Sequence, residues 1–250
     1  LIVLYDDFMP SQYEQEVKKL GIKNTILVQA TDTVDETKFM LDLASETPFI
    51  SGVVGWVDME SEDVLDQLRS FKDSPYFKGI RPMLQDIQNI AWITNPQFNA
   101  IFQFLSDAEL TFDALIKEEH ISYILQIARK YPALKIVLDH CAKPDIAAGR
   151  HESWVDTIAS FKQLENVFVK FSGLRTEANA GDNSVSTYKP YFDSIIEVFG
   201  VDRIMWGSDW PVIKLNGNAE SWIKICYEIL VDRPKSDQQK FWPQNARSFY

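Results

Sequence analysis

Seven short apolar runs recur along the chain about thirty residues apart, and this spacing restricts the fold more than any other feature. Each run is rich in Val, Ile, Leu and Phe and alternates only weakly with polar residues. That pattern is typical of strands covered on both faces, as in a parallel sheet. The predicted strands are Thr25–Ala30, Phe49–Val57, Lys78–Leu84, Leu110–Ile116, Lys135–His140, Val167–Gly173 and Arg203–Asp209.

The segments between these runs carry apolar residues at intervals of three and four, which predicts amphipathic helices. The first helix is expected to begin with Ser11 as its N-cap and to end at Gly21. Further helices are predicted at residues 60–71, 95–109, 119–131, 152–164, 188–200 and 219–230.

Repeated strand–helix units indicate an α/β protein, either an open doubly wound sheet or a closed (β/α)₈ TIM barrel. No GxGxxG motif follows the first strand, which weakens the dinucleotide-binding form. No linker rich in Pro, Gly or Ser interrupts the units, so we predict one barrel domain over residues 1–250 with its first strand at least partly absent. The opening LIVLY, residues 1–5, is either that strand or the tail of a longer N-terminal segment.

Charge and composition exclude several classes of partner. The net charge of −11 argues against nucleic acid and against an anionic membrane surface. The apolar run at Phe49–Val57 is too short to cross a bilayer. Two cysteines without a CxxC motif suggest a reducing compartment, and the first residues lack a basic leader, so we expect a cytoplasmic protein.

Polar residues at the predicted strand ends are the candidate site, because barrel enzymes place their chemistry at the C-terminal ends of the strands. An imidazole, several cations and a terminal carboxylate suit the attack of water on a polarised carbonyl. The candidates are Gln29, Arg81, Asp113, His140, Lys143, Lys170, Ser172, Arg175, Glu177 and Asp209, with Trp210 as a wall for a sugar.

Strand alternation predicts how the two central candidates point. If His140 faces into the barrel, Asp139 faces the helices and is structural. If Asp209 faces in, Gly207 does too and leaves space beneath the carboxylate. Cys141 then points away from His140, so the two cannot readily act as a nucleophilic pair.

Structural alternatives stay open for the same residues. Asp209 could cap a turn, His140 could be a core histidine, and Lys170 could pair with Glu177. Arg81 needs a carboxylate partner from the protein or from a ligand. The other two histidines, His120 and His151, fall at helix starts and are expected on the surface.

A metal site is weakly supported by the residues alone. Zinc takes three or four His, Cys or carboxylate ligands. The sequence has three histidines and neither an HxH nor an HExxH motif. Among the strand-end residues, His140 and Asp209 are therefore the two candidate metal ligands.

Several stretches together resemble the amidohydrolase-2 type of metal-dependent hydrolase, and within it the sugar lactonases similar to L-fucono- and L-rhamnonolactonases. LDHxxKP, KxSGLxTEA and GSDWPV are together specific for this group. The HxH pair that opens the first strand of the family is not in this sequence. The matching pieces are ILVQA, GVVGWVD, GIRPMLQD, LTFDALI, IVLDHCAKPDI, NVFVKFSGLRTEA, DRIMWGSDWPV and NARSFY.

The resemblance implies a (β/α)₈ barrel and roles for two residues. Asp209 matches the carboxylate that accepts a proton from the attacking water, and His140 matches a histidine that polarises the carbonyl or binds metal. One divalent ion, zinc in the first instance, is the implied cofactor, although lactonases of this subgroup do not strictly need it. Gln29, Arg81, Asp113, Lys143, Arg175 and Trp210 are the predicted substrate-binding residues.

The leading hypothesis is therefore a hydrolase that opens a small-molecule sugar-acid lactone, such as a fucono- or rhamnonolactone. One alternative is a hydrolase of a carboxylated pyrone or muconolactone. That reaction needs an arginine-rich anion pocket, and Arg81 and Arg175 alone support such a pocket weakly. Another is a barrel that binds a sugar acid without turnover. For the assembly of the protein, a homodimer stays open as an alternative to a monomer.

Overall fold

The computed structural model describes residues 2–250, and all seven predicted strands are present in it. They follow one another in the sheet in sequence order. Each is shorter than its apolar run, because the chain turns away at the strand ends. The strands are β1 Thr25–Val28, β2 Ile50–Gly55, β3 Phe77–Ile80, β4 Thr111–Ala114, β5 Ile136–Leu138, β6 Val167–Phe171 and β7 Ile204–Trp206.

The predicted helices are present as well, with shifted ends. α9 has the predicted bounds, whereas α2 was not foreseen although Thr33 caps it by accepting a hydrogen bond from the Glu36 amide. The helices are α1 Pro10–Val17, α2 Val34–Glu46, α3 Val64–Lys72, α4 Asn99–Asp107, α5 Ile121–Lys130, α6 His151–Ile158, α7 Leu174–Glu177, α8 Val185–Phe199, α9 Ala219–Leu230, α10 Lys235–Gln239 and α11 Asn245–Phe249.

Two expectations for the N-terminal region are wrong. Within LIVLY, Ile2–Leu4 form a turn of 3₁₀ helix, so the first of the two alternatives, a barrel strand, does not hold for these residues, and Leu1 lies outside the described residues. α1 has Met9 rather than Ser11 as its N-cap, because Pro10 takes the first helical position, where its missing N–H costs nothing. Gly21 does end this region, with a left-handed φ of 84°.

The chain divides into two compact units. One holds the described residues up to Ile22 together with residues 138–163 and 168–248. The other holds residues 23–137, 164–167 and 249–250. They are called here the first and the second unit.

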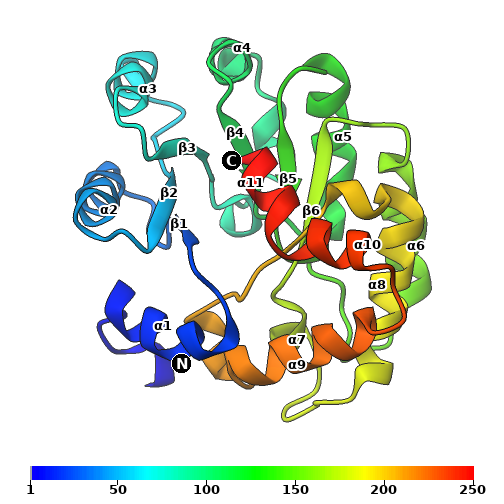
Figure 1. Ribbon diagram of the computed structural model, residues 1–250. Helices are drawn as coiled ribbons and strands as arrows, with labels where there is room; N and C mark the ends of the chain where they lie inside the picture. The colour runs from blue at the N-terminus through cyan, green and yellow to red at the C-terminus, as the bar shows by residue number, and fades with distance from the viewer. Residues whose placement is uncertain (1) are drawn as a thin grey trace. The chain divides into compact units, whose positions relative to one another are not determined.

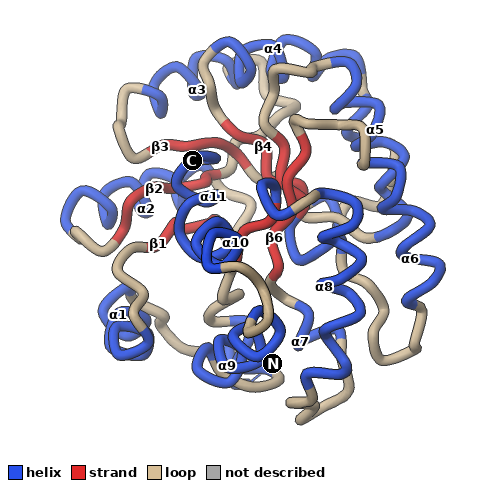
Figure 2. The backbone as a smooth tube through the Cα atoms, turned by 45° about the vertical axis from the view of Figure 1, so that its right-hand side comes forward, coloured by secondary structure: helices blue, strands red, loops and turns tan. Residues whose placement is uncertain are grey.

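In the second unit, β1 to β4 pair in parallel and helices cover them. α2 packs against β2, α3 against β3 and α4 against β4. Figures 1 and 2 both show α3 and α4 on the outer side of the strands that follow them. Each helix returns the chain to the start of the next strand, so the C-terminal ends of β1 to β4 share one edge.

In the first unit, β6 and β7 pair in parallel and aromatic residues fix the helices on them. The ring of Phe171 on β6 lies 5.2 Å from Phe192 of α8 and 5.1 Å from Trp222 of α9. Burying each such ring stabilises the fold by about 1.5–3 kcal/mol. This packing holds the ends of β6 and β7, from which two candidate site residues extend.

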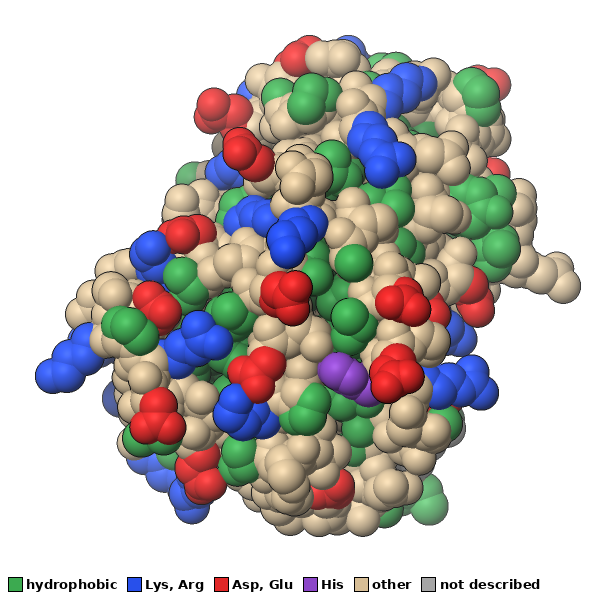
Figure 3. Space-filling view, turned by 90° about the vertical axis from the view of Figure 1, so that its right-hand side faces the viewer, with side chains coloured by type: hydrophobic (Ala, Val, Ile, Leu, Met, Phe, Trp, Pro, Cys, Tyr) green, Lys and Arg blue, Asp and Glu red, His purple; other side chains and the backbone are tan. Residues whose placement is uncertain are grey.

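Charges of both signs are interspersed on the face drawn in Figure 3 rather than gathered by sign. None of the helices in residues 2–250 combines the length and the apolar character that a bilayer crossing needs.

Candidate active site

The turn after β5 carries the first unit's candidate histidine in a left-handed backbone. His140, Cys141, Ala142 and Lys143 have φ values of 51°, 56°, 58° and 50°. Such conformations cost non-glycine residues roughly 1–2 kcal/mol each, and they persist where the surrounding structure fixes them, often at functional sites. β5 ends at Leu138, so His140 lies outside the strand. The prediction that strand alternation sets the direction of the His140 side chain is therefore wrong.

Two residues after β6 hold the imidazole of His140. The Ser172 hydroxyl lies 2.9 Å from His140 Nδ1, and Ser172 is 1% exposed. Gly173, with φ 69°, lies beneath the ring, and a Cβ at this position would come within 2.5 Å of His140 Cγ. The imidazole is therefore held both by a hydrogen bond and by a close approach that only glycine permits.

The space at Gly207 has a different use from the one predicted. A Cβ at Gly207 would lie 2.9 Å from the Cβ of Ser172. The gap left by the glycine therefore admits Ser172, the partner of His140, rather than remaining open beneath the carboxylate.

Asp209 lies opposite this histidine. Its Oδ1 is 3.5 Å from His140 Nε2, and the side chains are only 10% and 13% exposed. Asp209 also has a left-handed φ, 56°, and its carbonyl accepts a hydrogen bond from the Ile213 amide. The structure thus brings together a carboxylate and an imidazole, each largely shielded from solvent, at the ends of β7 and β5.

The described residues do not complete a zinc site. Zinc takes three or four protein ligands, or three and a water. His140 Nε2 and Asp209 Oδ1 supply two, and within residues 2–250 no group of three or more His, Cys, Asp or Glu could hold a metal ion.

Neighbouring charges form close pairs around the turn. Lys170 Nζ lies 2.8 Å from Asp139 Oδ1, and Asp139 is fully buried. Lys143 Nζ lies 3.8 Å from Glu177 Oε1. Lys170 is therefore paired with Asp139, and Lys143 with Glu177, while the structural role expected of Asp139 stays a prediction.

Cys141 is an ordinary buried thiol. Its Sγ donates to the carbonyl of Lys170, and burial raises the pKa of the thiol well above its usual value. A thiol that stays protonated is a poor nucleophile.

Arg175, predicted to bind substrate, is 2% exposed and donates to the protein itself. Its Nε lies 2.6 Å from the Asn216 carbonyl, and its Nη1 reaches Asn183 Oδ1 at 2.7 Å and Ser221 Oγ at 3.1 Å. These bonds tie the loop after β7 to α7 and give Arg175 a structural role.

Trp210, predicted as a sugar wall, also has protein partners. Its ring packs against Phe8 and Tyr13, at centroid distances of 5.4 and 5.0 Å, and its Nε1 donates to Glu16. Burial raises the pKa of Tyr13 to about 12. The N-terminal helix α1 therefore covers the turn that carries Asp209, a contact that no local pattern could have indicated.

Three predicted substrate-binding residues lie in the second unit. Gln29 Nε2 donates to the Arg81 carbonyl at 2.5 Å, and the Arg81 guanidinium donates back to the Gln29 carbonyl. Asp113 is fully buried and accepts from Thr111 Oγ1 at 3.2 Å and from the Tyr250 hydroxyl at 2.6 Å. Their roles toward a substrate stay predictions.

One expectation for a single residue is wrong, and one residue of the site had only a weak signal in the sequence. His120 is only 2% exposed, because its ring folds back to accept from the Lys117 amide, so it is not a surface residue. Ser172 was named among the strand-end polar residues but not singled out. Its signal was its place before Gly173 in the SGL motif.

Parallel strands in sequence order, with ionisable groups after them, define the class of barrel-type α/β enzymes. The amidohydrolase family matches residues 3–250, and the chain belongs to that family. The predicted membership is confirmed.

Two relatives and a solved structure illustrate the likeness. An L-fucono-1,5-lactonase from Burkholderia ambifaria is 39% identical over 90% of this chain and 79% of that protein. An L-fucono-1,5-lactonase from Burkholderia multivorans is 28% identical over 85% of this chain and 75% of that protein. The structure of an amidohydrolase from Burkholderia multivorans with bound zinc is 26% identical, with a TM-score of 0.94 over 99% of this chain and 90% of that one. This likeness confirms the predicted fold class.

Proposed function

We propose that this protein hydrolyses the lactone of a sugar acid, with Asp209 and His140 as its catalytic residues. The observation that carries the proposal is the 3.5 Å approach of His140 Nε2 to Asp209 Oδ1 in a largely shielded setting. The similarity to L-fucono-1,5-lactonases supports a six-membered aldonolactone as the substrate.

The first step is the attack of water on the ring carbonyl. Asp209 accepts a proton from the water as the new C–O bond forms, and the carbonyl electrons move onto its oxygen. In this proposal the Ser172 hydroxyl, 2.9 Å from His140 Nδ1, donates to that nitrogen, so that the imidazole carries its hydrogen on Nε2. That N–H then donates to the developing oxyanion.

The second step opens the ring. The oxyanion re-forms the carbonyl, the bond to the ring oxygen breaks, and the proton held by Asp209 passes to the leaving alkoxide. The product is the open hydroxy acid, and Asp209 returns to its carboxylate form, so atoms and charge balance.

A carboxylate is a weak base compared with the alkoxide that leaves, so electrophilic help has to carry much of the rate. A single oxyanion donor typically contributes about 10²–10³-fold. Lactone esters are already activated, so one carboxylate and one held imidazole suffice. Arg175 donates its hydrogen bonds to Asn216 and Asn183 within the protein. This argues against a carboxylated pyrone as the substrate, because its carboxylates would need guanidinium groups that are free to bind them.

The test is Asp209→Asn, assayed on L-fucono-1,5-lactone. We expect turnover to fall at least about a hundredfold, because the amide cannot accept the proton, while circular dichroism stays unchanged. Asp193→Asn, which removes an exposed carboxylate paired with Lys189 in the same unit, is the control and should keep normal turnover. Near-normal turnover of the Asp209 variant would contradict the role of Asp209 as the proton acceptor.

A further inference from the structure

The turn after β7 carries Asp209 in a backbone conformation that needs support from its surroundings. Its φ of 56° lies in the left-handed region, which costs a non-glycine residue roughly 1–2 kcal/mol. Such conformations persist where the neighbouring structure fixes them. Within the turn, the Asp209 carbonyl accepts from the Ile213 amide at 2.8 Å, and the Trp210 amide donates to Ser208 Oγ at 3.2 Å. The side chains on both sides of Asp209 are held by residues near the start of the chain.

Trp210, the neighbour on the C-terminal side, is held by Glu16 of α1. Trp210 Nε1 donates to Glu16 Oε2 at 3.0 Å, a bond strengthened by the charge on its acceptor. Lys214 Nζ lies 3.7 Å from the same oxygen and 5.4 Å from the ring centres of both Trp210 and Phe8. One carboxylate therefore fixes two side chains of the segment that follows Asp209.

Ser208, the neighbour on the N-terminal side, is held by Tyr13 of the same helix. The Tyr13 side chain is buried and is hydrogen-bonded to that of Ser208. The Tyr13 ring also packs on Trp210, with a centroid distance of 5.0 Å. Because Tyr13 and Glu16 are three positions apart, they lie on one face of α1. That single face holds the residues on both sides of Asp209.

The helix that supplies these contacts is itself anchored in the first unit. Val17, at its end, is fully buried. Lys19, in the 3₁₀ turn that follows α1, lies with its Nζ 3.0 Å from Glu220 Oε2 in the first turn of α9. Figure 1 shows α1 beside α9, which it contacts. α1 is thus a fixed support for the turn.

We propose that Tyr13 and Glu16 are positioning residues that hold the Asp209 carboxylate against His140. The inference rests on the proposed function for the role of Asp209, and it goes further by giving the first helix a part in catalysis. Both residues act through the neighbours of Asp209 and not on the lactone itself. A reacting group displaced by about 1 Å can lose about 10²-fold in rate, so a loosened turn lowers kcat more than it changes KM.

The main variant is Glu16→Ala, assayed on L-fucono-1,5-lactone. We expect kcat to fall about tenfold with KM within about twofold, because Trp210 and Lys214 lose their shared partner. Glu16→Gln keeps an oxygen that accepts from Trp210, so its kcat should stay within about threefold of the wild-type value. The control is Glu14→Ala on the same helix, which removes a carboxylate paired with Lys18 and should change neither constant.

Tyr13→Phe tests the other side of Asp209. It keeps the ring against Trp210 and removes the hydroxyl that is bonded to Ser208. We expect kcat to fall about threefold with KM unchanged. The control is Tyr227→Phe, which removes the hydroxyl of an exposed tyrosine on α9 and should leave kcat at its wild-type value.

A double variant shows whether Glu16 acts through Asp209. In the Asp209→Asn background, adding Glu16→Ala should lower kcat by less than about twofold, because the carboxylate that Glu16 positions is already gone. If the two losses multiply instead, Glu16 acts independently of Asp209 and the inference is wrong. An unchanged kcat in the single variant Glu16→Ala overturns it as well.

A measurement without turnover separates this inference from the proposed function. The chain has three histidines, so their ring signals can be resolved by NMR of histidine-labelled protein. Glu16→Ala should shift the His140 signal in the same direction as Asp209→Asn does, and leave those of His120 and His151 unchanged. If the wild type opens no lactone, the proposed function fails, yet this comparison still decides whether α1 positions Asp209. An unshifted His140 signal, or equal shifts of all three signals, overturns the inference.

Discussion

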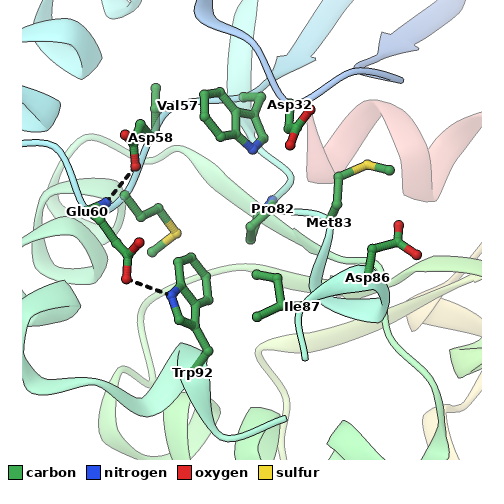
Figure 4. Close-up of a pocket in the computed structure, with 11 residues that line it drawn as sticks. Asp32, Val57, Asp58, Glu60, Pro82, Met83, Asp86, Ile87 and Trp92 are labelled. Atoms are coloured by element: carbon green, nitrogen blue, oxygen red, sulfur yellow. Dashed lines mark hydrogen bonds between the residues drawn. The ribbon is translucent and has the colours of Figure 1, made fainter. Parts of the chain in front are cut away.

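The turn that carries His140 and a cavity of about 290 Å³ that Trp92 borders in the second unit (Figure 4) place carboxylates in opposite surroundings. Asp209 is 10% exposed and faces an imidazole that is itself held by Ser172. Glu60 and Asp86 are exposed and line an open space. The first arrangement is rigid and supported by a strained backbone, which suits a reacting group, whereas the second is solvated and accessible, which suits recognition of a ligand. The comparison teaches that the surroundings of a carboxylate, and not its chemical type, separate a shielded group from a solvated one.

The sharpest way to break this comparison is to disturb the rigid region sterically. Gly173→Ala would place a methyl group 2.5 Å from His140 Cγ and must displace the ring. Turnover is expected to fall at least about a hundredfold. Gly149→Ala is the matched control, because Gly149 has the same φ, 69°, with nothing within 4 Å of its Cβ position. Equal loss of activity in both variants would show that backbone strain alone, and not contact with His140, is responsible.

A smaller effect is expected from the hydrogen bond that orients the imidazole. Ser172→Ala should lower kcat about tenfold with KM nearly unchanged and shift the pH dependence of kcat, because the tautomer is no longer fixed. The control is Ser194→Ala, whose hydroxyl lies 3.1 Å from His151 Nε2 in another serine–histidine pair. A change in KM alone would argue that Ser172 contacts substrate rather than positioning His140.

Metal removal should have less effect still. The described residues supply two of the three or four ligands that zinc takes, so dialysis against a chelator is expected to change turnover less than about threefold. Activity on L-fucono-1,5-lactone before and after dialysis, with metal content measured in parallel, checks this. A loss restored by adding zinc would mean that the rigid region works as a metal site.

The smallest effect concerns a partly buried carboxylate, Asp182, that has fixed hydrogen-bond partners. Hydrogen bonds from the Ser184 amide and the Thr187 hydroxyl lower the pKa of Asp182. Because the folded-state pKa is depressed, its stabilising effect is present above the unfolded pKa of about 4 and is lost as the pH falls through the folded value. Asp182→Asn should therefore lower Tm by about 2 °C at pH 7 and leave it unchanged well below pH 3. A difference in Tm that persists in acid would point to lost packing instead of lost charge.

Local pattern was enough to locate the seven strands and many of the helices. The run KIVLDH predicted β5, and AESWIKICYEIL predicted α9 with its observed bounds, since apolar periodicity reflects which face each residue buries. The predicted strands were too long at their C-terminal ends. Residues such as His140 leave the strand in a left-handed turn, and a non-glycine residue gives no sequence signal for that conformation. α2 was missed despite the Thr33–Glu36 capping signal at its start.

The candidate site was predictable only in part. Strand-end position and the LDHxxKP and GSDWPV motifs identified His140 and Asp209. Their 3.5 Å approach depends on a contact between residues far apart in the chain. The same holds for the hydrogen bonds that Arg175 and Trp210 donate within the protein. Periodicity carries no information on such pairs.

The sequence by itself therefore determined the order of strands and helices, the family and the two ionisable residues most suited to catalysis, because these follow from local propensity and motif. Only the tertiary structure decided which polar groups satisfy one another and which remain available to a ligand. The physical reason is that a buried polar group must find a partner wherever the packed chain provides one. Arg175 donates to Asn216, Asn183 and Ser221, whereas the exposed carboxylate of Asp86 accepts from Gln85 and borders a cavity.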